Sequence, residues 1–363
     1  MPRIAIVLPP WERFSPSAAH AISLLARMMA WPSGGGEAVI YGSPVAAPFS
    51  DVIFRPLSLP WRPFAVSQRY AAGAVKAMAG QQPDLIEVHD SPDLALYVAR
   101  KLPKIPVTLF LHNDPQTMPY AKTVQERAFL LARLATVAPV SDYVRQRLLE
   151  GVETRAAVEV FPNFVDLTAV PKPAPQKCIL FAGRVAMDKG ADSFVAACAK
   201  ALKLLPGWRA EIVGADEPGW EGIDPVFLSK LKLDADAANV ALLGWRPNAD
   251  VLRAMAKAAI VVVPSREPEP FGLSALEAMA CGAPLLCSPR GGLAEVMGAA
   301  ALPINPDDPA MIAANIVALA LDAPRRKALS QAGLAQAAGF SAIIAMHRLA
   351  ELRQRVLTAW PRH

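Results

Sequence analysis

Short apolar runs, many of them rich in β-branched residues, recur along this chain, and segments of helical composition separate them. An apolar run without polar alternation is typical of a strand buried on both faces, as in a parallel sheet covered by helices. The alternation therefore predicts an α/β fold with doubly wound parallel sheets. The runs are Ile4 to Leu8, Leu85 to Val88, Val107 to Leu111, Ile179 to Phe181, Ala210 to Val213, Val240 to Leu243, Ile260 to Val263 and Pro284 to Cys287.

Length and composition indicate two domains rather than one. With 363 residues, of which 53% are hydrophobic, the chain can build two α/β domains with sizeable cores. Residues 171–177 hold three prolines, which forbid a helix and favour an extended spacer. We therefore expect the domains to divide at this segment.

The segment 264–284, PSREPEPFGLSALEAMACGAP, predicts an anion-binding site. Its Pro-Phe-Gly turn follows the apolar run 259–263 and so lies at the carboxyl end of a buried strand, where open parallel sheets bind ligands. Gly272 lets the backbone approach a ligand, and the amides of Leu273 and Ser274 open a helix without intrahelical partners. The positive end of the helix dipole favours a phosphate or diphosphate there.

Two glutamates bracket the same turn. A carboxylate beside a bound diphosphate would be repelled by it, so Glu269 and Glu277 are expected to accept hydrogen bonds from neutral hydroxyl groups. Sugars and ribose supply such hydroxyls, and the pattern therefore favours a sugar nucleotide. The alternative is that Glu269 is a solvated loop charge and Glu277 an ordinary helix carboxylate.

Two cations follow another predicted strand. Arg184 comes directly after Gly183 at the end of the strand, and Lys189 lies within the following loop. Arg184 can donate to two phosphate oxygens while Lys189 acts as a point charge, so the pair would neutralise a diphosphate and stabilise it as a leaving group. The alternative is that both are surface cations.

Together these segments resemble the family-4 retaining glycosyltransferases of GT-B fold. The resemblance extends through most of the C-terminal half. The matching segments are 264–284, Phe181-Ala182-Gly183-Arg184, Asp188-Lys189-Gly190 and, more weakly, residues 290–296 and 305–308.

The resemblance implies two Rossmann-like domains that face a cleft. Residues 1–171 would form the acceptor domain and residues 172–341 the nucleotide-sugar donor domain. The last helix, within about 342–363, would cross back onto the first domain.

The resemblance also implies a reaction. A hexosyl group would move, with retention, from a UDP- or GDP-sugar to a saccharide or lipid-linked acceptor in lipopolysaccharide, exopolysaccharide or glycolipid biosynthesis in a bacterium. The leaving phosphate itself would take the acceptor proton. Two alternatives remain: a sugar-nucleotide epimerase or phosphorylase of GT-B type, and a non-catalytic sugar-nucleotide-binding subunit.

By the same resemblance, each site residue has an expected ligand. Arg184 and Lys189 contact the donor diphosphate, Glu277 binds the ribose, and Glu269 binds the transferring sugar. The other donor-binding positions are Gly183 at the strand end, the backbone of Gly244, Trp245 and Arg246 facing the base, and Phe271, Gly272, Leu273 and Ser274 beside the sugar and phosphate.

The N-terminal half carries fainter matches. His112 follows an apolar strand and is similar to the family's strand-end histidine, which faces the donor sugar; the alternative is a structural hydrogen-bonding role. Asp90 follows another strand and would either orient an acceptor hydroxyl or cap the next helix.

The first loop departs from the family pattern, since the glycine-rich turn of most relatives is missing and no glycine occurs before Gly34. Either Glu12 and Arg13 contact a distinct acceptor, or the small residues from Ser15 to Ala18 make the close approach. The sequence leaves both hypotheses open.

The net charge and the sequence motifs limit the classes of partner that the protein can bind. The net charge of +5 suits an anionic partner, such as a nucleotide or an anionic lipid surface, and no nucleic-acid-binding motif is present. We expect a cytoplasmic protein with no cofactor. We also expect no metal, because Arg184 and Lys189 would replace a cation, and Asp234-Ala235-Asp236 is expected to be a solvated loop.

Peripheral contact with an anionic inner membrane would use Leu57 to Ala65, unless this loop packs on the protein. The four cysteines are expected to be reduced core thiols.

Overall fold

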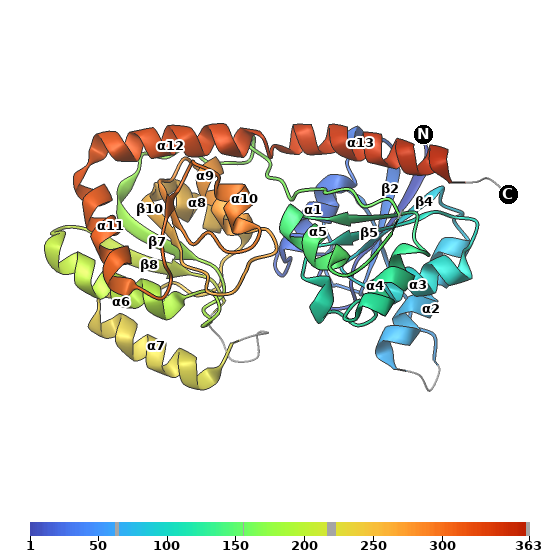
Figure 1. The fold of residues 1–363 in the computed structure, drawn as a ribbon, viewed down its shortest axis with the longest axis horizontal. Coiled ribbons are helices and arrows are strands. Elements are labelled where there is room, and N and C mark those ends of the chain that lie inside the picture. The colour runs from blue at the N-terminus through green and yellow to red at the C-terminus, as the bar shows by residue number, and fades with distance from the viewer. Residues whose placement is uncertain (62–64, 155, 216–222, 361–363) are drawn as a thin grey trace. The chain divides into compact units, whose positions relative to one another are not determined.

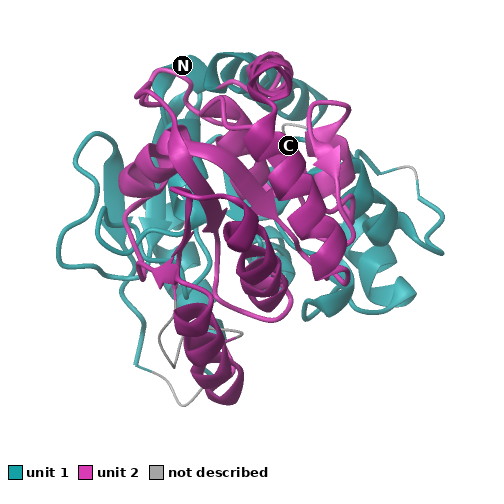
Figure 2. Ribbon diagram, turned by 90° about the vertical axis from the view of Figure 1, so that its left-hand side faces the viewer, with its two compact units in different colours: residues 1–163, 342–363 teal, residues 164–341 magenta. Residues whose placement is uncertain are grey.

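The computed structural model describes residues 1–61, 65–154, 156–215 and 223–360. The chain forms two compact units, one of residues 1–163 with 342–363 and the other of residues 164–341. Figure 2 colours the first unit teal and the second magenta.

The first unit is a six-stranded parallel sheet with the strand order β3-β2-β1-β4-β5-β6. The chain winds outward from β1 in one direction and then from β4 in the other, so the winding reverses between these two strands. The strands are β1 Arg3–Val7, β2 Glu37–Gly42, β3 Ile53–Pro56, β4 Leu85–His89, β5 Val107–Leu111 and β6 Thr136–Pro139. The helices are α1 Ala21–Met29, η1 Pro32–Gly34, α2 Val66–Ala79, α3 Pro92–Lys101, η2 Pro115–Thr117, α4 Val124–Leu131, α5 Asp142–Leu149 and α13 Ala342–Ala359.

The second unit repeats this topology with the order β12-β11-β10-β7-β8-β9, and its winding reverses between β7 and β10. The strands are β7 Gln176–Ala182, β8 Arg209–Val213, β9 Val240–Leu242, β10 Ala258–Val263, β11 Leu285–Cys287 and β12 Leu302–Pro303. The helices are α6 Ala191–Ala201, η3 Leu202–Leu204, α7 Pro225–Ala237, α8 Asn248–Lys257, α9 Leu273–Ala280, α10 Leu293–Met297, α11 Pro309–Leu321 and α12 Ala323–Ala338.

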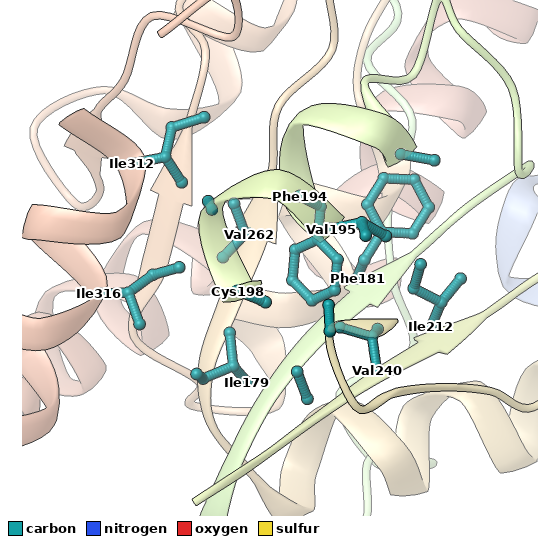
Figure 3. Packing of buried hydrophobic residues seen from close by; sticks show 14 of the residues in the cluster. Ile179, Phe181, Phe194, Val195, Cys198, Ile212, Val240, Val262, Ile312 and Ile316 are labelled. Atoms are coloured by element: carbon teal, nitrogen blue, oxygen red, sulfur yellow. The ribbon is translucent and has the colours of Figure 1, made fainter. Parts of the chain in front are cut away.

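The core of the second unit shows why the apolar runs predicted the sheet. Ile179 and Val262 of the central strands are fully buried and belong to one cluster with Phe194 of α6 and Ile316 of α11 (Figure 3). Helices α6 and α11 thus cover these strands. With the two parallel strand orders, this confirms the expected α/β fold with two doubly wound parallel sheets.

The division between the units lies at residues 163 and 164, not at the proline-rich segment 171–177. Val165 explains the difference, because its amide donates to the Phe340 carbonyl at 3.0 Å and it pairs with Ser341 in a parallel bridge. These contacts attach the chain to the second unit before the prolines, and residues 171–175 lead into β7 within that unit.

A second expectation is corrected in α7. Residues 234–236, expected to be a solvated loop, form the last turn of this helix, where Lys230 pairs with Asp234 one turn away at 2.5 Å. Polar residues on the exposed face of a helix do not interrupt the helix, and the polar composition of this segment is that of the exposed end of α7.

A buried ion pair fastens α13 to the first sheet. The Nε and Nη2 atoms of Arg353 each lie 2.7 Å from an oxygen of Glu87 on β4, and both side chains are 1% exposed. Arg353 also donates through Nη1 to the Gly34 carbonyl at 2.7 Å. The last helix is therefore a structural part of the first unit.

The four cysteines are free thiols, and three of them are buried. In the described ranges, no helix is both long enough and apolar enough to cross a membrane.

Candidate functional site

Two loops meet where the winding of the second sheet reverses, one after β7 and the other after β10. Gly190 permits this approach, because its φ is +71° and an added Cβ would lie 2.0 Å from the Pro264 carbonyl oxygen. The Arg266 amide also donates to the Asp188 carbonyl at 2.8 Å. The residues expected to bind a diphosphate and those expected to bind a sugar therefore lie on adjoining loops, at the ligand-binding edge of the sheet.

Lys189 and Glu269, eighty positions apart, form an ion pair between these loops. The Lys189 Nζ lies 2.5 Å from the Glu269 Oε1, and the Ser265 hydroxyl donates to the same oxygen at 2.7 Å. Glu269 is 15% exposed and Ser265 2% exposed, so the pair lies mostly below the surface. An arriving phosphate would compete with Glu269 for the Lys189 ammonium.

Arg184, at the end of β7, is the more accessible cation. Its Nη2 lies 2.9 Å from the Asp188 Oδ2, and its side chain is 37% exposed. A guanidinium has five N–H donors in a planar fork, a geometry that suits phosphate oxygens.

The Pro-Phe-Gly turn presents backbone and buries its apolar groups. Phe271 is buried and packs edge-on against Phe340, with ring centroids 5.8 Å apart. Gly272 has a φ of +95° and precedes the first residue of α9, and an added Cβ would lie 2.2 Å from Leu293. Leu273 and Ser274 are partly exposed in the first turn, where helix amides have no intrahelical acceptor.

Glu277 lies further along α9 and is held by a residue that the sequence analysis missed. Asn248, at the start of α8, donates through Nδ2 to the Glu277 Oε1 at 2.8 Å. Burial raises the pKa of Glu277 to about 7, although the Asn248 hydrogen bond acts in the opposite direction. This carboxyl group therefore titrates close to neutral pH.

The strand-end segment 244–246 precedes α8. Gly244 has a φ of +70°, and its carbonyl accepts from the Gly214 amide at 3.1 Å. Trp245 packs against the core of the second unit, while Arg246 is exposed and donates to the Trp245 carbonyl. Gly183 lies directly against Gly214, where an added Cβ would lie 1.7 Å from the Gly183 carbonyl oxygen.

Arg266 is a further residue that the sequence analysis missed. Its guanidinium donates to both oxygens of Asp192 at 2.6 and 2.9 Å and to the Ser193 hydroxyl at 2.6 Å. It also donates to the Met187 carbonyl at 2.9 Å and to Asp307 at 3.0 Å. Arg266 thus fixes the loop that carries Glu269 onto the start of α6 and onto the loop that carries Lys189.

In the first unit, Asp90 shapes the loop that carries His112. The Asp90 Oδ1 accepts from the His112 and Asn113 amides at 2.9 and 3.0 Å, and Oδ2 accepts from the Asn113 side chain at 2.6 Å. Asp90 does not cap the next helix, because α3 begins after Ser91. The Asp90 side chain is turned instead to the loop of His112 and Asn113. With three donors on its carboxylate, Asp90 holds the loop after β5 against the end of β4.

His112 is paired with a second histidine. The His89 Nδ1 lies 2.9 Å from the His112 Nε2, and the His89 ring stacks on Phe110 with centroids 5.0 Å apart. Burial lowers the pKa of both imidazoles, so both are neutral near pH 7. Neutral His112 can serve as a hydrogen-bonding group but carries no charge toward a ligand. The sequence offered no signal for the role of His89.

The first loop turns two of its three expected acceptor residues inward. Glu12 is 3% exposed, and its Oε2 accepts from the Ser23 amide at 3.2 Å and from the Ser23 hydroxyl. Burial raises the pKa of Glu12. Ser15 is also buried, and Arg13 is exposed. Glu12 therefore ties the loop to α1, and Arg13 is the residue of these three that can meet an acceptor.

Family models match both halves of the chain. Residues 19–169 match the model described as Glycosyltransferase Family 4, and residues 166–336 match the model described as Glycosyl transferases group 1.

Curated relatives align with part of the chain. A D-inositol 3-phosphate glycosyltransferase of Segniliparus rotundus is 32% identical over 170 residues, which cover 46% of this chain and 37% of that protein. The O-antigen chain mannosyltransferase B of Escherichia coli is 36% identical over 145 residues, covering 39% of this chain and 37% of that protein. The chain thus spans less than half the length of these two relatives.

Solved structures match over nearly the whole length. HepE of Anabaena, solved in complex with UDP and glucose, superposes with a TM-score of 0.79 at 18% identity, covering 98% of this chain and 100% of that one. The chain therefore has the GT-B fold, and its two halves match two glycosyltransferase families.

Proposed function

We propose that this protein is a retaining glycosyltransferase that moves a hexosyl group from a nucleoside diphosphate sugar to an acceptor hydroxyl. The observation that carries the proposal is the Lys189–Glu269 pair with Ser265 beside the start of α9. One edge of the sheet thus combines a cation and helix amides for a diphosphate with carboxylates for sugar hydroxyls.

In the proposed reaction, the acceptor oxygen attacks the anomeric carbon while the bond from that carbon to the diphosphate breaks. The nucleoside diphosphate leaves with the electron pair, and its oxygen takes the acceptor proton. Arg184 and Lys189 stabilise the charge that develops on the leaving group. Attack on the face that the leaving group vacates retains the configuration.

The two carboxylates have separate proposed tasks. Glu269 is freed from Lys189 when phosphate takes over the ammonium, and then accepts from hydroxyls of the sugar. Glu277, held by Asn248, accepts from the ribose. We propose that the cations replace a metal ion, which predicts activity in the presence of a chelator.

The relatives suggest donor and acceptor classes. HepE was solved with UDP and glucose, which favours a UDP-sugar here, and a GDP-sugar stays the other candidate from the sequence. Their names also suggest a polyol phosphate or a saccharide as acceptor. We propose a cytoplasmic reaction that builds an envelope saccharide or glycolipid.

The test begins with thermal stabilisation of the protein by UDP, GDP, ADP, CMP and TDP. Ligand at about 100 times its dissociation constant should add about 2.7 kcal/mol to the free energy of unfolding. We expect one nucleotide to stabilise the wild type and to lose this effect in Arg184→Ala. The matched control is Arg253→Ala, which removes another exposed arginine paired within its own helix, with Asp250.

The same nucleotide's sugars are then assayed for transfer. Glu269→Gln should lower turnover, and Glu277→Ala should weaken nucleotide affinity. Nucleotide binding without transfer to any acceptor would favour the non-catalytic subunit, and stabilisation by no nucleotide would refute the donor site.

A further inference from the structure

A hollow of about 630 Å³ is lined by residues of α2, α3 and the α4 region of the first unit, apart from the residues discussed above. Figure 1 labels these three helices. Its charged lining is strongly unbalanced toward the positive. Four cations face one carboxylate: Arg69, Arg100, Lys101 and Arg133 against Asp93.

The cations are not neutralised within the described part of the chain. Arg100 lies over the Tyr97 ring at 5.4 Å, and Arg133 lies over the Phe129 ring at 4.7 Å. Arg69 donates to the Pro60 carbonyl at 3.0 Å. A carbonyl or an aromatic ring orients a cation but leaves its charge uncompensated, so the hollow attracts anions.

Exposed apolar side chains surround the same hollow. Phe129 is 51% exposed and Tyr120 56% exposed, and both line it. Val66, at the start of α2 and next to the lining residue Ser67, is 62% exposed. Apolar groups at the rim of a cationic surface gain free energy at a lipid interface, where they leave water.

We propose that this surface docks on an anionic lipid bilayer, with lipid phosphates held by the cations of the hollow and the exposed rings at the headgroup level. A soluble phosphate would satisfy the charge but would leave Phe129, Tyr120 and Val66 in water. A lipid surface complements both the charge and the apolar rim. The inference concerns residues of the first unit alone and does not depend on the proposed transfer.

The surface differs from the one that the sequence suggested. The sequence left two interpretations of the segment from Leu57 to Ala65, membrane contact or a loop packed on the protein, and residues 62–64 lie outside the described residues. Of that segment, Pro60 lines the hollow.

Vesicle sedimentation with the full chain tests the proposal. Vesicles of phosphatidylcholine alone are compared with vesicles that also contain phosphatidylglycerol, at low and high salt. The wild type should bind the anionic vesicles and lose binding in high salt. Arg100→Gln combined with Arg133→Gln should weaken this binding about 30-fold, since each cation near an anionic surface contributes about fivefold.

The matched control is Lys200→Gln combined with Lys203→Gln, which removes two exposed lysines from the second unit. It should bind anionic vesicles like the wild type. Phe129→Ala should also weaken binding. Both hollow variants should keep the wild-type midpoint of urea denaturation, which shows that they are folded. The proposal would be overturned if the wild type did not bind anionic vesicles, or if the control lost as much vesicle binding as the variants of the hollow. If inorganic phosphate binds in the hollow and the wild type binds no vesicles, a site for a soluble anion would replace the proposed membrane surface.

Discussion

The carboxyl group of Glu277 gives the sharpest quantitative prediction. Burial raises its pKa from 4.5 to about 7, so the folded protein holds this proton more tightly than the unfolded chain. The resulting stabilisation is complete below pH 4.5 and is lost as the pH rises through 7. Glutamine has a similar shape without the charge, and its amide oxygen can still accept from Asn248.

The magnitude follows from the size of the shift. Each pKa unit corresponds to about 1.4 kcal/mol, so a fully expressed shift is worth about 3 kcal/mol between acidic and alkaline pH. Glu277 is partly exposed, and screening by water reduces the expected value to about 1 to 3 kcal/mol. Glu277→Gln should therefore be more stable relative to the wild type at about pH 8 than at about pH 5 by this amount.

Urea denaturation of both proteins at the two pH values measures the difference directly. Taking the difference between variant and wild type removes the titration of every other group that the substitution leaves unchanged. Glu351→Gln, which alters an exposed carboxylate on α13, is the control and should give the same difference at both pH values. A pH-independent difference for Glu277→Gln would refute the buried-carboxyl reasoning.

Three further substitutions test other contacts. Arg353→Met leaves Glu87 as an uncompensated buried charge and should cost about 3 to 5 kcal/mol in urea denaturation, most of which Arg353→Met with Glu87→Met should restore. Lys189→Met should weaken nucleotide binding about 10- to 100-fold by calorimetry, because a charge-assisted hydrogen bond to phosphate is worth about 1.5 to 3 kcal/mol; unchanged affinity would remove Lys189 from the donor site. Gly190→Ala places a Cβ against the Pro264 carbonyl and should both lower the denaturation midpoint and weaken nucleotide binding, whereas loss of stability alone would confine the glycine to the fold.

The parts of the fold that the sequence predicted are those set by local pattern. An apolar run such as 260–263 predicts a buried strand, and a turn glycine before a helix, such as Gly272, predicts a close approach, whichever residues pack against them. Polar composition was a weaker guide: it indicated a loop at residues 234–236, where an exposed helix continues to its last turn.

The partners of the site residues could not be predicted, because they come from distant parts of the chain. Asn248 reaches Glu277 across 29 positions, and Arg266 reaches Asp192 across 74. Arg353 and Glu87 are 266 positions apart. A single sequence shows that each of these residues can donate or accept, but only the folded sheet decides which pairs meet.

The glycine-free first loop shows how such a partner changes an interpretation. One of the two hypotheses for this loop had Glu12 meet an acceptor, yet its carboxyl group accepts from the Ser23 amide in the first turn of α1. The amides at the start of a helix are a place where a phosphate can bind, and here a carboxylate of the chain itself lies against one of them. The Ser23 amide already donates to Glu12 and is therefore not available to a bound diphosphate. Under the proposed function, the counter-charge for the donor must therefore come from Arg184, Lys189 and the start of α9, which makes their substitution the decisive experiment.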